Sequence, residues 1–176
     1  MKKILLIGFR GTGKTTLGMK IAKALGWEFI DADEELEKSA GKSIREMVSE
    51  RGWTYFRELE REHLKSLLGK SKVVCALGGG AILHKEEMGN LKKESLVIAL
   101  KADLVDIKER LMSDPKTLSQ RPSLTSLDWE REVETLYVER LPRYQEFAHV
   151  VFNTSEASSE ELVLRVIDIL KKEDCP

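Results

Sequence analysis

The sequence predicts an α/β protein, a three-layer α/β/α sandwich in which helices cover both faces of a parallel sheet. Short apolar runs alternate with helical patterns along the whole chain, and this alternation is typical of parallel strands that are buried on both sides. Crossovers between parallel strands are right-handed, which restricts the topology to a doubly wound sheet. No internal repeat or low-complexity linker interrupts the pattern, so a single domain over residues 1–176 is expected.

The strands are predicted from short apolar runs in the sequence. The five expected strands are residues 4–7, 28–31, 72–77, 96–100 and 150–152. Sheets of this kind bind ligands beyond the carboxyl ends of their strands. Functional residues are therefore expected directly after each of these five runs.

The helices are predicted from apolar residues that recur three and four positions apart. Gly26 is expected to end the first helix. Ser43 and Glu46 form a capping box at the start of the second, which Gly52 interrupts, and Pro142 is expected to break or kink the fourth. The expected helices are residues 16–25, 43–68, 102–112, 128–147 and 159–172.

The composition narrows the class of protein. Hydrophobic residues make up 41% and charged residues 34% of the chain, as in a globular protein. The net charge is −1, which argues against a nucleic-acid-binding surface because such a surface needs a basic excess. No apolar patch points to a partner chain, so a monomer is expected.

The cysteines and the N-terminal residues indicate the cellular compartment in which the protein is expected. Cys75 and Cys175 lie far apart in the sequence, without the spacing of a disulfide framework or a metal site. The apolar run at 4–7 is too short for a secretory signal or a membrane span. A cytoplasmic protein without a membrane partner is therefore expected.

The segment Gly8–Thr15 satisfies the pattern G-x-x-x-x-G-K-[ST] in full, between an expected strand and an expected helix. Backbone N–H groups of such a loop cradle phosphates, the lysine reaches the β- and γ-phosphates, and the hydroxyl ligates Mg²⁺. A glycine-rich turn without a ligand is the alternative, and the strand–loop–helix context disfavours it. No N-K-x-D motif follows, so ATP is favoured over GTP. The residues predicted to bind ATP·Mg²⁺ here are Gly11, Thr12, Gly13, Lys14, Thr15 and Thr16.

Two carboxylates follow the second expected strand. Asp31 and Asp33 lie two positions apart, so one can serve a metal ion and the other an acceptor substrate. The alternative is a helix N-terminus, where Asp is favoured as a cap. The two roles are compatible.

Candidate acceptor contacts follow in three places. Arg57 and Glu60 are spaced i, i+3 on a helix, which would preset the arginine for a carboxylate or phosphate; a solvated surface pair is the commoner alternative. Gly78–Gly80 lies at a strand's carboxyl end and favours a close ligand over a flexible connector. Arg140 and Arg143 bracket Pro142, with surface charge as their alternative.

The irregular segment at 113–126 carries Arg121. A loop of this kind fits a lid that brings positive charge to a transferring phosphoryl group. Four other residues are interpreted as structural, the histidines among them as surface groups: Trp53, His63, His84 and His149.

Together these motifs resemble the shikimate kinases over essentially the whole chain. The resemblance rests on Gly8–Thr15, Asp31-Ala32-Asp33, Phe56-Arg57 with Glu60, Gly78–Gly80, Arg121-Pro122, residues 140–144 and residues 151–154. It implies a nucleoside-monophosphate-kinase-like fold with strand order 2-3-1-4-5 and transfer of the ATP γ-phosphoryl group to the 3-hydroxyl of shikimate, a step of aromatic amino-acid biosynthesis.

The resemblance also implies roles for individual residues. Asp33 would accept the proton of the acceptor hydroxyl, and Asp31 would hold Mg²⁺. Arg57 and Arg140 would clamp the shikimate carboxylate, with Gly78, Gly79 and Gly80 lining the same pocket. The acceptor-binding helical region would span residues 32–62. Arg121 would be the arginine of the lid, and the nucleotide would also contact Arg110 and Asn153.

Two residues depart from the usual family pattern. Ser123 and Arg143 stand where the family usually has leucine. Both lie beside expected contact residues and leave the arginines in place. Two other functions stay open from the residues alone: a kinase of another small hydroxy acid such as gluconate, and a non-catalytic nucleotide-binding regulatory module.

Overall fold

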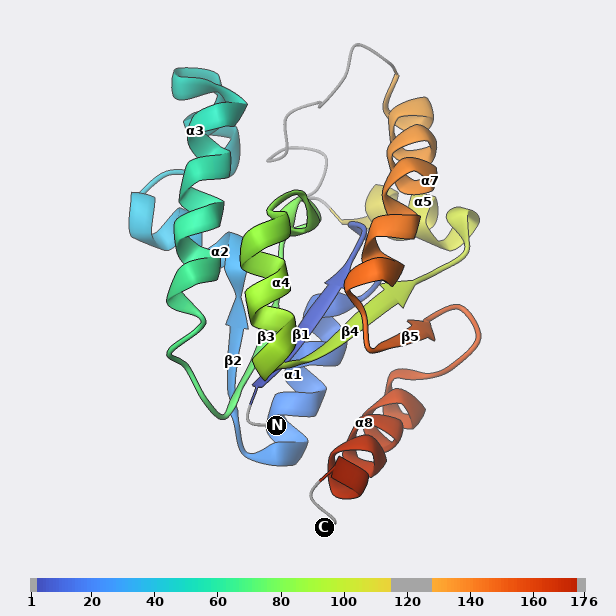
Figure 1. Cartoon of the computed structure of the whole chain (residues 1–176). Coiled ribbons are helices and arrows are strands. Elements are labelled where there is room, and N and C mark those ends of the chain that lie inside the picture. The colour runs from blue at the N-terminus through green and yellow to red at the C-terminus, as the bar shows by residue number, and fades with distance from the viewer. Residues whose placement is uncertain (1–2, 115–127, 174–176) are drawn as a thin grey trace.

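A five-stranded parallel sheet forms the centre of the protein, in the order β2-β3-β1-β4-β5 (Figure 1). The computed structural model describes residues 3–114 and 128–173. The order 2-3-1-4-5 is as predicted. The strands are β1 (Lys3–Gly8), β2 (Glu28–Asp31), β3 (Val73–Ala76), β4 (Leu96–Lys101) and β5 (Val150–Asn153). All four pairings are parallel, so every strand ends at the same edge of the sheet.

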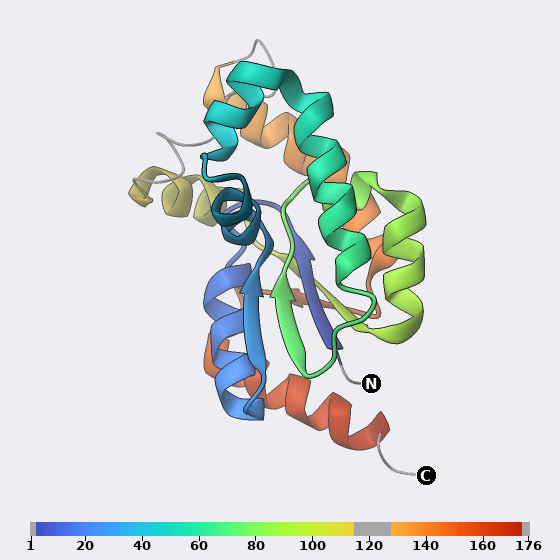
Figure 2. The ribbon, with the colours of Figure 1, turned by 90° about the vertical axis from the view of Figure 1, so that its left-hand side faces the viewer.

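Helices cover both faces of this sheet (Figure 2). The helices of the described residues are α1 (Lys14–Leu25), α2 (Ala32–Ala40), α3 (Ile44–Ser66), the 3₁₀ turn η1 (Ala81–Leu83), α4 (Lys85–Glu94), α5 (Leu104–Ser113), α7 (Trp129–Phe147) and α8 (Ser159–Glu173). Figure 2 shows α1 and α3 on opposite sides of the strands.

The alternation of side chains along β1 divides the core in two. Leu5 and Ile7 point to one face, where α3, α4, α5 and α7 contribute the buried apolar residues. Ile4 and Leu6 point to the other, against α1 and α8. Successive residues of a strand face opposite sides, so a strand that is buried on both faces must be apolar at every position. In β1 the four residues between Lys3 and Gly8 are all apolar.

A third and smaller core lies away from the sheet, where α2 packs on α3. It consists of Leu36, Ile44, Met47 and Phe56. Since these side chains contact one another rather than the strands, the region that α2 and α3 form beyond the sheet edge is stabilised by a separate set of contacts.

Local signals in the sequence set most helix ends as predicted. Gly26 ends α1 with φ 65°, a left-handed conformation that glycine adopts at little cost. Ser43 and Glu46 form the capping box of α3, and Gly52 interrupts that helix with φ 80°. Pro142, by contrast, lies inside a continuous α7, so of the predicted break or kink the break is wrong.

The sequence patterns did not predict α4 and η1, and they allowed α2 only through the alternative of Asp31 as a helix cap. The apolar face of α4 consists of Met88 and Leu91 among charged residues, which is too few for a clear helical period. The helix forms because these two side chains enter the core beside α3 and α7. None of the helices in the described parts of the chain is long and apolar enough to cross a lipid bilayer.

Candidate active site

Two pockets lie at the edge where the strands end. The P-loop pocket is bounded by the 8–15 loop, the start of α1, Asp31, Arg110 and Thr154, among others. The α3 pocket is lined by Phe9, Arg10, Asp33, Ile44, Trp53, Phe56, Arg57, Glu60, Gly78, Gly79, Gly80 and Arg140. The predicted residues therefore divide into two groups, one for each pocket.

The P-loop pocket is built mainly from backbone. Gly8 must be glycine because an added Cβ would overlap the carbonyl oxygen of Leu100. Gly13 precedes α1 with φ 90°, and the first turn of α1 carries no acidic side chain. Because Gly13 has no side chain to cap the helix, the first N–H groups of α1 are available to an anion.

Lys14 closes the loop on itself. Its Nζ donates to the carbonyl oxygens of Gly8 and Phe9, at 2.9 Å each. These contacts hold the ammonium group over the loop, where it lines the P-loop pocket together with Thr15 and Thr16. The lysine therefore shapes the loop as well as supplying its charge.

The remaining predicted nucleotide contacts differ in what their side chains do. The buried Thr12 hydroxyl donates to the carbonyl oxygen of Phe9 at 2.7 Å, so this side chain shapes the loop from inside. Arg110 lines the pocket and donates to the backbone oxygen of Gly11 at 3.2 Å. Asn153 accepts a bond from the backbone of Ser155, and its neighbour Thr154 lines the pocket.

Asp31 accepts three hydrogen bonds, which make it the helix cap that the sequence allowed and place it beside the P-loop. Its Oδ1 accepts from the backbone N–H groups of Asp33 and Glu34, which caps α2. Its Oδ2 accepts from the Thr15 hydroxyl at 2.7 Å. One carboxylate therefore joins the end of β2 to the start of α1, and presents an oxygen beside the P-loop.

The α3 pocket contains a buried ion pair. Arg57 donates through Nη1 to Glu60 Oε2 at 2.7 Å, and Glu60 is 4% exposed. The surface-pair alternative is therefore wrong, because these groups are largely removed from water. The Arg57 guanidinium also lies 5.2 Å from the ring centroid of Trp53. Trp53, which was interpreted as structural only, thus forms part of the pocket.

His84 completes this ion pair. Its Nε2 lies 2.8 Å from Glu60 Oε2, and the residue is 5% exposed. Burial acts to raise the pKa of Glu60, but the hydrogen bond from His84 and the charge of Arg57 outweigh it and hold that pKa below its ordinary value. The prediction that His84 is a surface group was wrong, since a histidine between two helices gives no sequence signal of its burial.

Gly78–Gly80 forms the floor between these groups. A Cβ at Gly78 would lie 2.7 Å from Asp33 Oδ1 and 3.0 Å from Glu60 Oε1. At Gly80 it would overlap the guanidinium of Arg57. A side chain at Gly78 or Gly80 would therefore displace these groups, whereas a Cβ at Gly79 would make only ordinary contacts, so the segment is more than a flexible connector.

Residues of α7 form the opposite wall. Arg140 is 9% exposed and donates to the carbonyl oxygen of Gly79 at 3.4 Å, so it is not a surface charge. The Tyr144 hydroxyl donates to the same oxygen at 2.7 Å. Burial raises the pKa of Tyr144 to about 12, so this hydroxyl stays a hydrogen-bond donor well above neutral pH.

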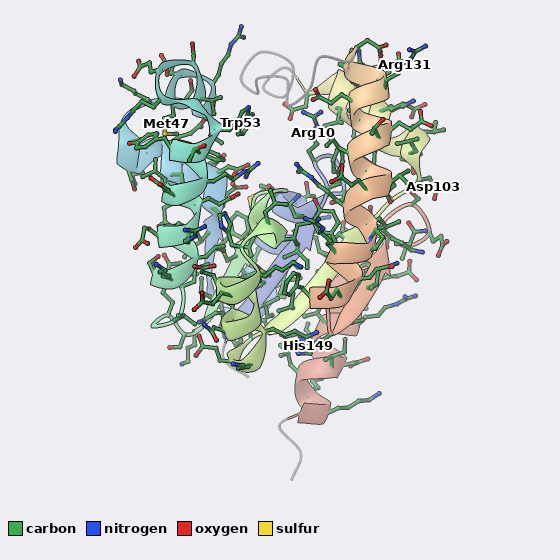
Figure 3. All side chains as sticks on the ribbon, turned by 45° about the horizontal axis from the view of Figure 1, so that its top comes forward. Arg10, Met47, Trp53, Asp103, Arg131 and His149 are labelled. Carbon is green, nitrogen blue, oxygen red and sulfur yellow. The ribbon has the colours of Figure 1, made fainter. Side chains whose placement is uncertain are left out.

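The two pockets meet at three described residues, because Arg10, Asp33 and Gly79 line both. Arg10 was not predicted, since it occupies a position where the P-loop pattern accepts any residue. It pairs with Glu132 of α7 at 3.2 Å. In Figure 3, Arg10 and Trp53 lie on facing sides of the opening between α7 and α3.

One predicted group falls outside this description. Arg121 and nearly all of the predicted lid at 113–126 lie outside the described residues. The described residues also contain no cluster of three or more His, Cys, Asp or Glu side chains that could hold a metal ion by themselves.

The fold and the joined pockets define a P-loop kinase that acts on a small molecule. A family model for shikimate kinase matches residues 10–171, and the chain belongs to the shikimate kinase family. It is therefore an enzyme of the phosphotransferase class, as the sequence predicted.

Individual relatives agree with the family model. Shikimate kinases of Syntrophus aciditrophicus and Thermodesulfovibrio yellowstonii are 38% and 39% identical to this chain; the matches cover 94% and 95% of it, and 89% and 94% of those proteins. Among solved structures, shikimate kinase from Acinetobacter baumannii in complex with shikimate matches with a TM-score of 0.89 at 30% identity, over 100% of this chain and 96% of that one.

Proposed function

We propose that the protein transfers the γ-phosphoryl group of ATP to the 3-hydroxyl of shikimate, giving shikimate 3-phosphate and ADP. The observation that carries this proposal is the junction of the two pockets at Asp33, Arg10 and Gly79. Phosphoryl transfer depends mainly on placing donor and acceptor in line and on neutralising charge. A phosphate cradle that opens directly into a second, arginine-lined pocket meets both needs.

The α3 pocket suits the chemistry of a hydroxylated carboxylic acid. Glu60 engages Nη1 of Arg57, and a guanidinium has five N–H donors in a planar fork, so the same group can also receive a carboxylate. Arg140 lies across the pocket, over the Gly78–Gly80 floor. We assign the acceptor's carboxylate to the two arginines and its hydroxyls to Asp33 and the glycine N–H groups.

Asp33 is the proposed base. The acceptor oxygen forms a bond to the γ-phosphorus while its proton passes to the Asp33 carboxylate. The bond from that phosphorus to the β–γ bridging oxygen breaks, and ADP leaves with the electron pair. The positive groups that would stabilise the charge on the phosphates lie in the P-loop pocket: Lys14, Arg10 and the first N–H groups of α1.

Magnesium fits Thr15 and Asp31. Their oxygens already lie 2.7 Å apart beside the P-loop, and Mg²⁺ prefers hard oxygen ligands, taking few from the protein and the rest from water and phosphates. We propose that these two residues hold the ion, with Asp31 acting through water. When bound, it would neutralise charge on the β- and γ-phosphates.

Several predictions from the sequence belong with this proposal. Arg121 would supply further charge to the transferring group, and residues 32–62 would form the acceptor-binding region. ATP and shikimate would be the binding partners, without nucleic acid or membrane. A single domain, a monomer and a cytoplasmic location also stay predictions, which size-exclusion chromatography and cell fractionation test.

A coupled assay of ADP release tests the reaction directly. Shikimate, quinate and gluconate are offered at equal concentrations with ATP and Mg²⁺, and the phosphorylated carbon is identified by NMR. Shikimate should give the highest kcat/KM, with phosphate on its 3-hydroxyl. Preference for gluconate would replace the proposed acceptor, and ATP binding without turnover of any acceptor would favour a non-catalytic nucleotide-binding module.

A further inference from the structure

We propose that His84 is a positioning residue for acceptor binding. It fixes the carboxylate of Glu60, and Glu60 in turn holds the Arg57 guanidinium in the orientation that receives the acceptor's carboxylate. The inference deepens the proposed function and rests on its assignment of Arg57 to the acceptor. His84 itself does not line the α3 pocket and acts through Glu60.

The contacts form a chain from α4 to the pocket. His84 stands between η1 and α4, where its Nε2 lies 2.8 Å from Glu60 Oε2. The same oxygen accepts the bond from Arg57 Nη1 at 2.7 Å. Glu60 Oε1 faces the glycine floor, 3.0 Å from the position of a Cβ at Gly78. His84 and Arg57 therefore both hold the same oxygen of the Glu60 carboxylate, and together they fix its position.

Loss of the His84 hydrogen bond would affect this arrangement more than a surface bond would. Glu60 is 4% exposed, so water cannot readily replace a missing donor, and a buried charge needs several hydrogen bonds. With Arg57 as its remaining partner, the carboxylate can turn about its last side-chain torsion. Arg57 would turn with it, away from the acceptor.

The position of His84 allows a role in acceptor binding to be distinguished from a role in nucleotide binding. His84 lines an outer depression between α3 and α4, beside Arg61 and Lys65, and does not contribute to the P-loop pocket. A change at His84 should therefore alter acceptor binding and leave ATP binding unchanged. A residue that only stabilised the fold would affect both substrates together.

Three variants of the full chain separate these possibilities. His84→Leu keeps much of the packing and removes the donor. His84→Gln places an amide N–H near the position of Nε2 and should restore the bond. His63→Leu is the matched control, because His63 is another largely buried histidine near a carboxylate, 3.5 Å from Glu35, and it lines neither of the pockets.

The measurement is the KM for shikimate and the KM for ATP in the coupled assay, with the melting temperature of each variant. His84→Leu should raise the KM for shikimate about tenfold, as expected for a lost hydrogen bond to a buried charge, and leave the KM for ATP unchanged. His84→Gln should recover most of the loss. In an Arg57→Ala background, His84→Leu should add nothing further, because the two residues act as one unit.

Three results would overturn the role of His84: an unchanged KM for shikimate in His84→Leu, an equal rise in both KM values, or full additivity with Arg57→Ala. If His84→Leu does not fold, His84→Asn replaces it, since its amide is too short to reach Glu60. A wild-type protein without turnover of shikimate would contradict the proposed function, whereas normal wild-type turnover with any of these three results contradicts His84 alone.

Discussion

The P-loop pocket and the α3 pocket are built on different principles. The P-loop pocket takes its main features from one continuous segment, whose glycines and helix N-terminus present backbone groups to an anion. The α3 pocket takes single side chains from α3, α7 and the loop after β3. A site of backbone groups can be recognised from spacing alone, whereas a site of side chains depends on how distant elements pack.

The two pockets also differ in what supports them. The P-loop follows β1, whose side chains are buried in the sheet core on both faces. The outer wall of the α3 pocket is stabilised by the small apolar cluster of Leu36, Ile44, Met47 and Phe56. Substitutions in the α3 pocket should therefore alter acceptor binding selectively, and the following predictions test this separation from the largest effect to the smallest.

Asp33→Asn should give the largest loss, because it removes the base at the junction and nearly preserves the shape of the side chain. We expect kcat to fall by a factor of about 10²–10⁴, with both substrates still bound. Glu34→Gln is the control, as an exposed carboxylate one position further along α2. A normal kcat in Asp33→Asn would exclude this residue as base.

Arg57→Ala should show most clearly that the two pockets bind different substrates. Truncating one partner of a buried charge pair costs about 2–5 kcal/mol, so the Kd for shikimate should rise by a factor of about 30 or more, with ATP affinity retained. Arg61→Ala is the control, as a half-exposed arginine on the same helix. Equal losses for both substrates by calorimetry would remove Arg57 from the acceptor site.

Gly80→Ala should displace Arg57 without removing it, since the added methyl group would overlap the guanidinium. We expect the KM for shikimate to rise about tenfold, comparable to the loss of one charge-assisted hydrogen bond. Gly89→Ala is the control because a Cβ there has no atom within 4 Å, and it should stabilise α4 by about 0.4–1 kcal/mol. An unchanged KM in Gly80→Ala would show that the floor adapts.

Asp31 variants should separate capping from metal binding. Asp31→Asn keeps a good helix cap, whereas Asp31→Ala should lower the free energy of unfolding by about 1 kcal/mol. Both should raise the Mg²⁺ concentration needed for half-maximal turnover, measured at fixed ATP. If Asp31→Asn leaves this concentration unchanged, Asp31 acts as a cap alone.

His63 should have the smallest effect, on stability alone. Burial lowers the pKa of His63 in spite of the nearby Glu35, so the folded protein binds this proton less readily than the unfolded chain, whose pKa is about 6.5. Stability is therefore complete above that pH and decreases as the pH falls through it. His63→Gln should reduce the drop in melting temperature between pH 7.5 and 5.5; an identical drop would show that other groups cause it.

How far the sequence predicts a residue depends on whether its role is local. Gly13, Lys14 and Thr15 were placed by a contiguous motif, and Gly26 and Ser43 by helix-end chemistry that acts within a few residues. His84 and Arg10 were not assigned to the site, because each acquires its role from a neighbour that is distant in the sequence, Glu60 and Glu132 respectively. Trp53 lies only about one helical turn from Arg57, and it was missed because only the packing around α3 shows that this face of the helix lines a pocket. The helix α4 was missed for a related reason, since its two core residues are too few to form a pattern.

The sequence by itself determined the strands of the sheet, the five helices with a clear apolar period and the phosphate-binding loop, because these depend on periodicity and on the conformational freedom of a few glycines. The tertiary structure decided how the acceptor side is assembled. It buried Arg57, Glu60 and His84 together, brought Arg140 over Gly79 and placed Asp33 where the two pockets meet. The physical reason is that charge pairing in a buried site depends on distances between elements that spacing along the chain does not specify.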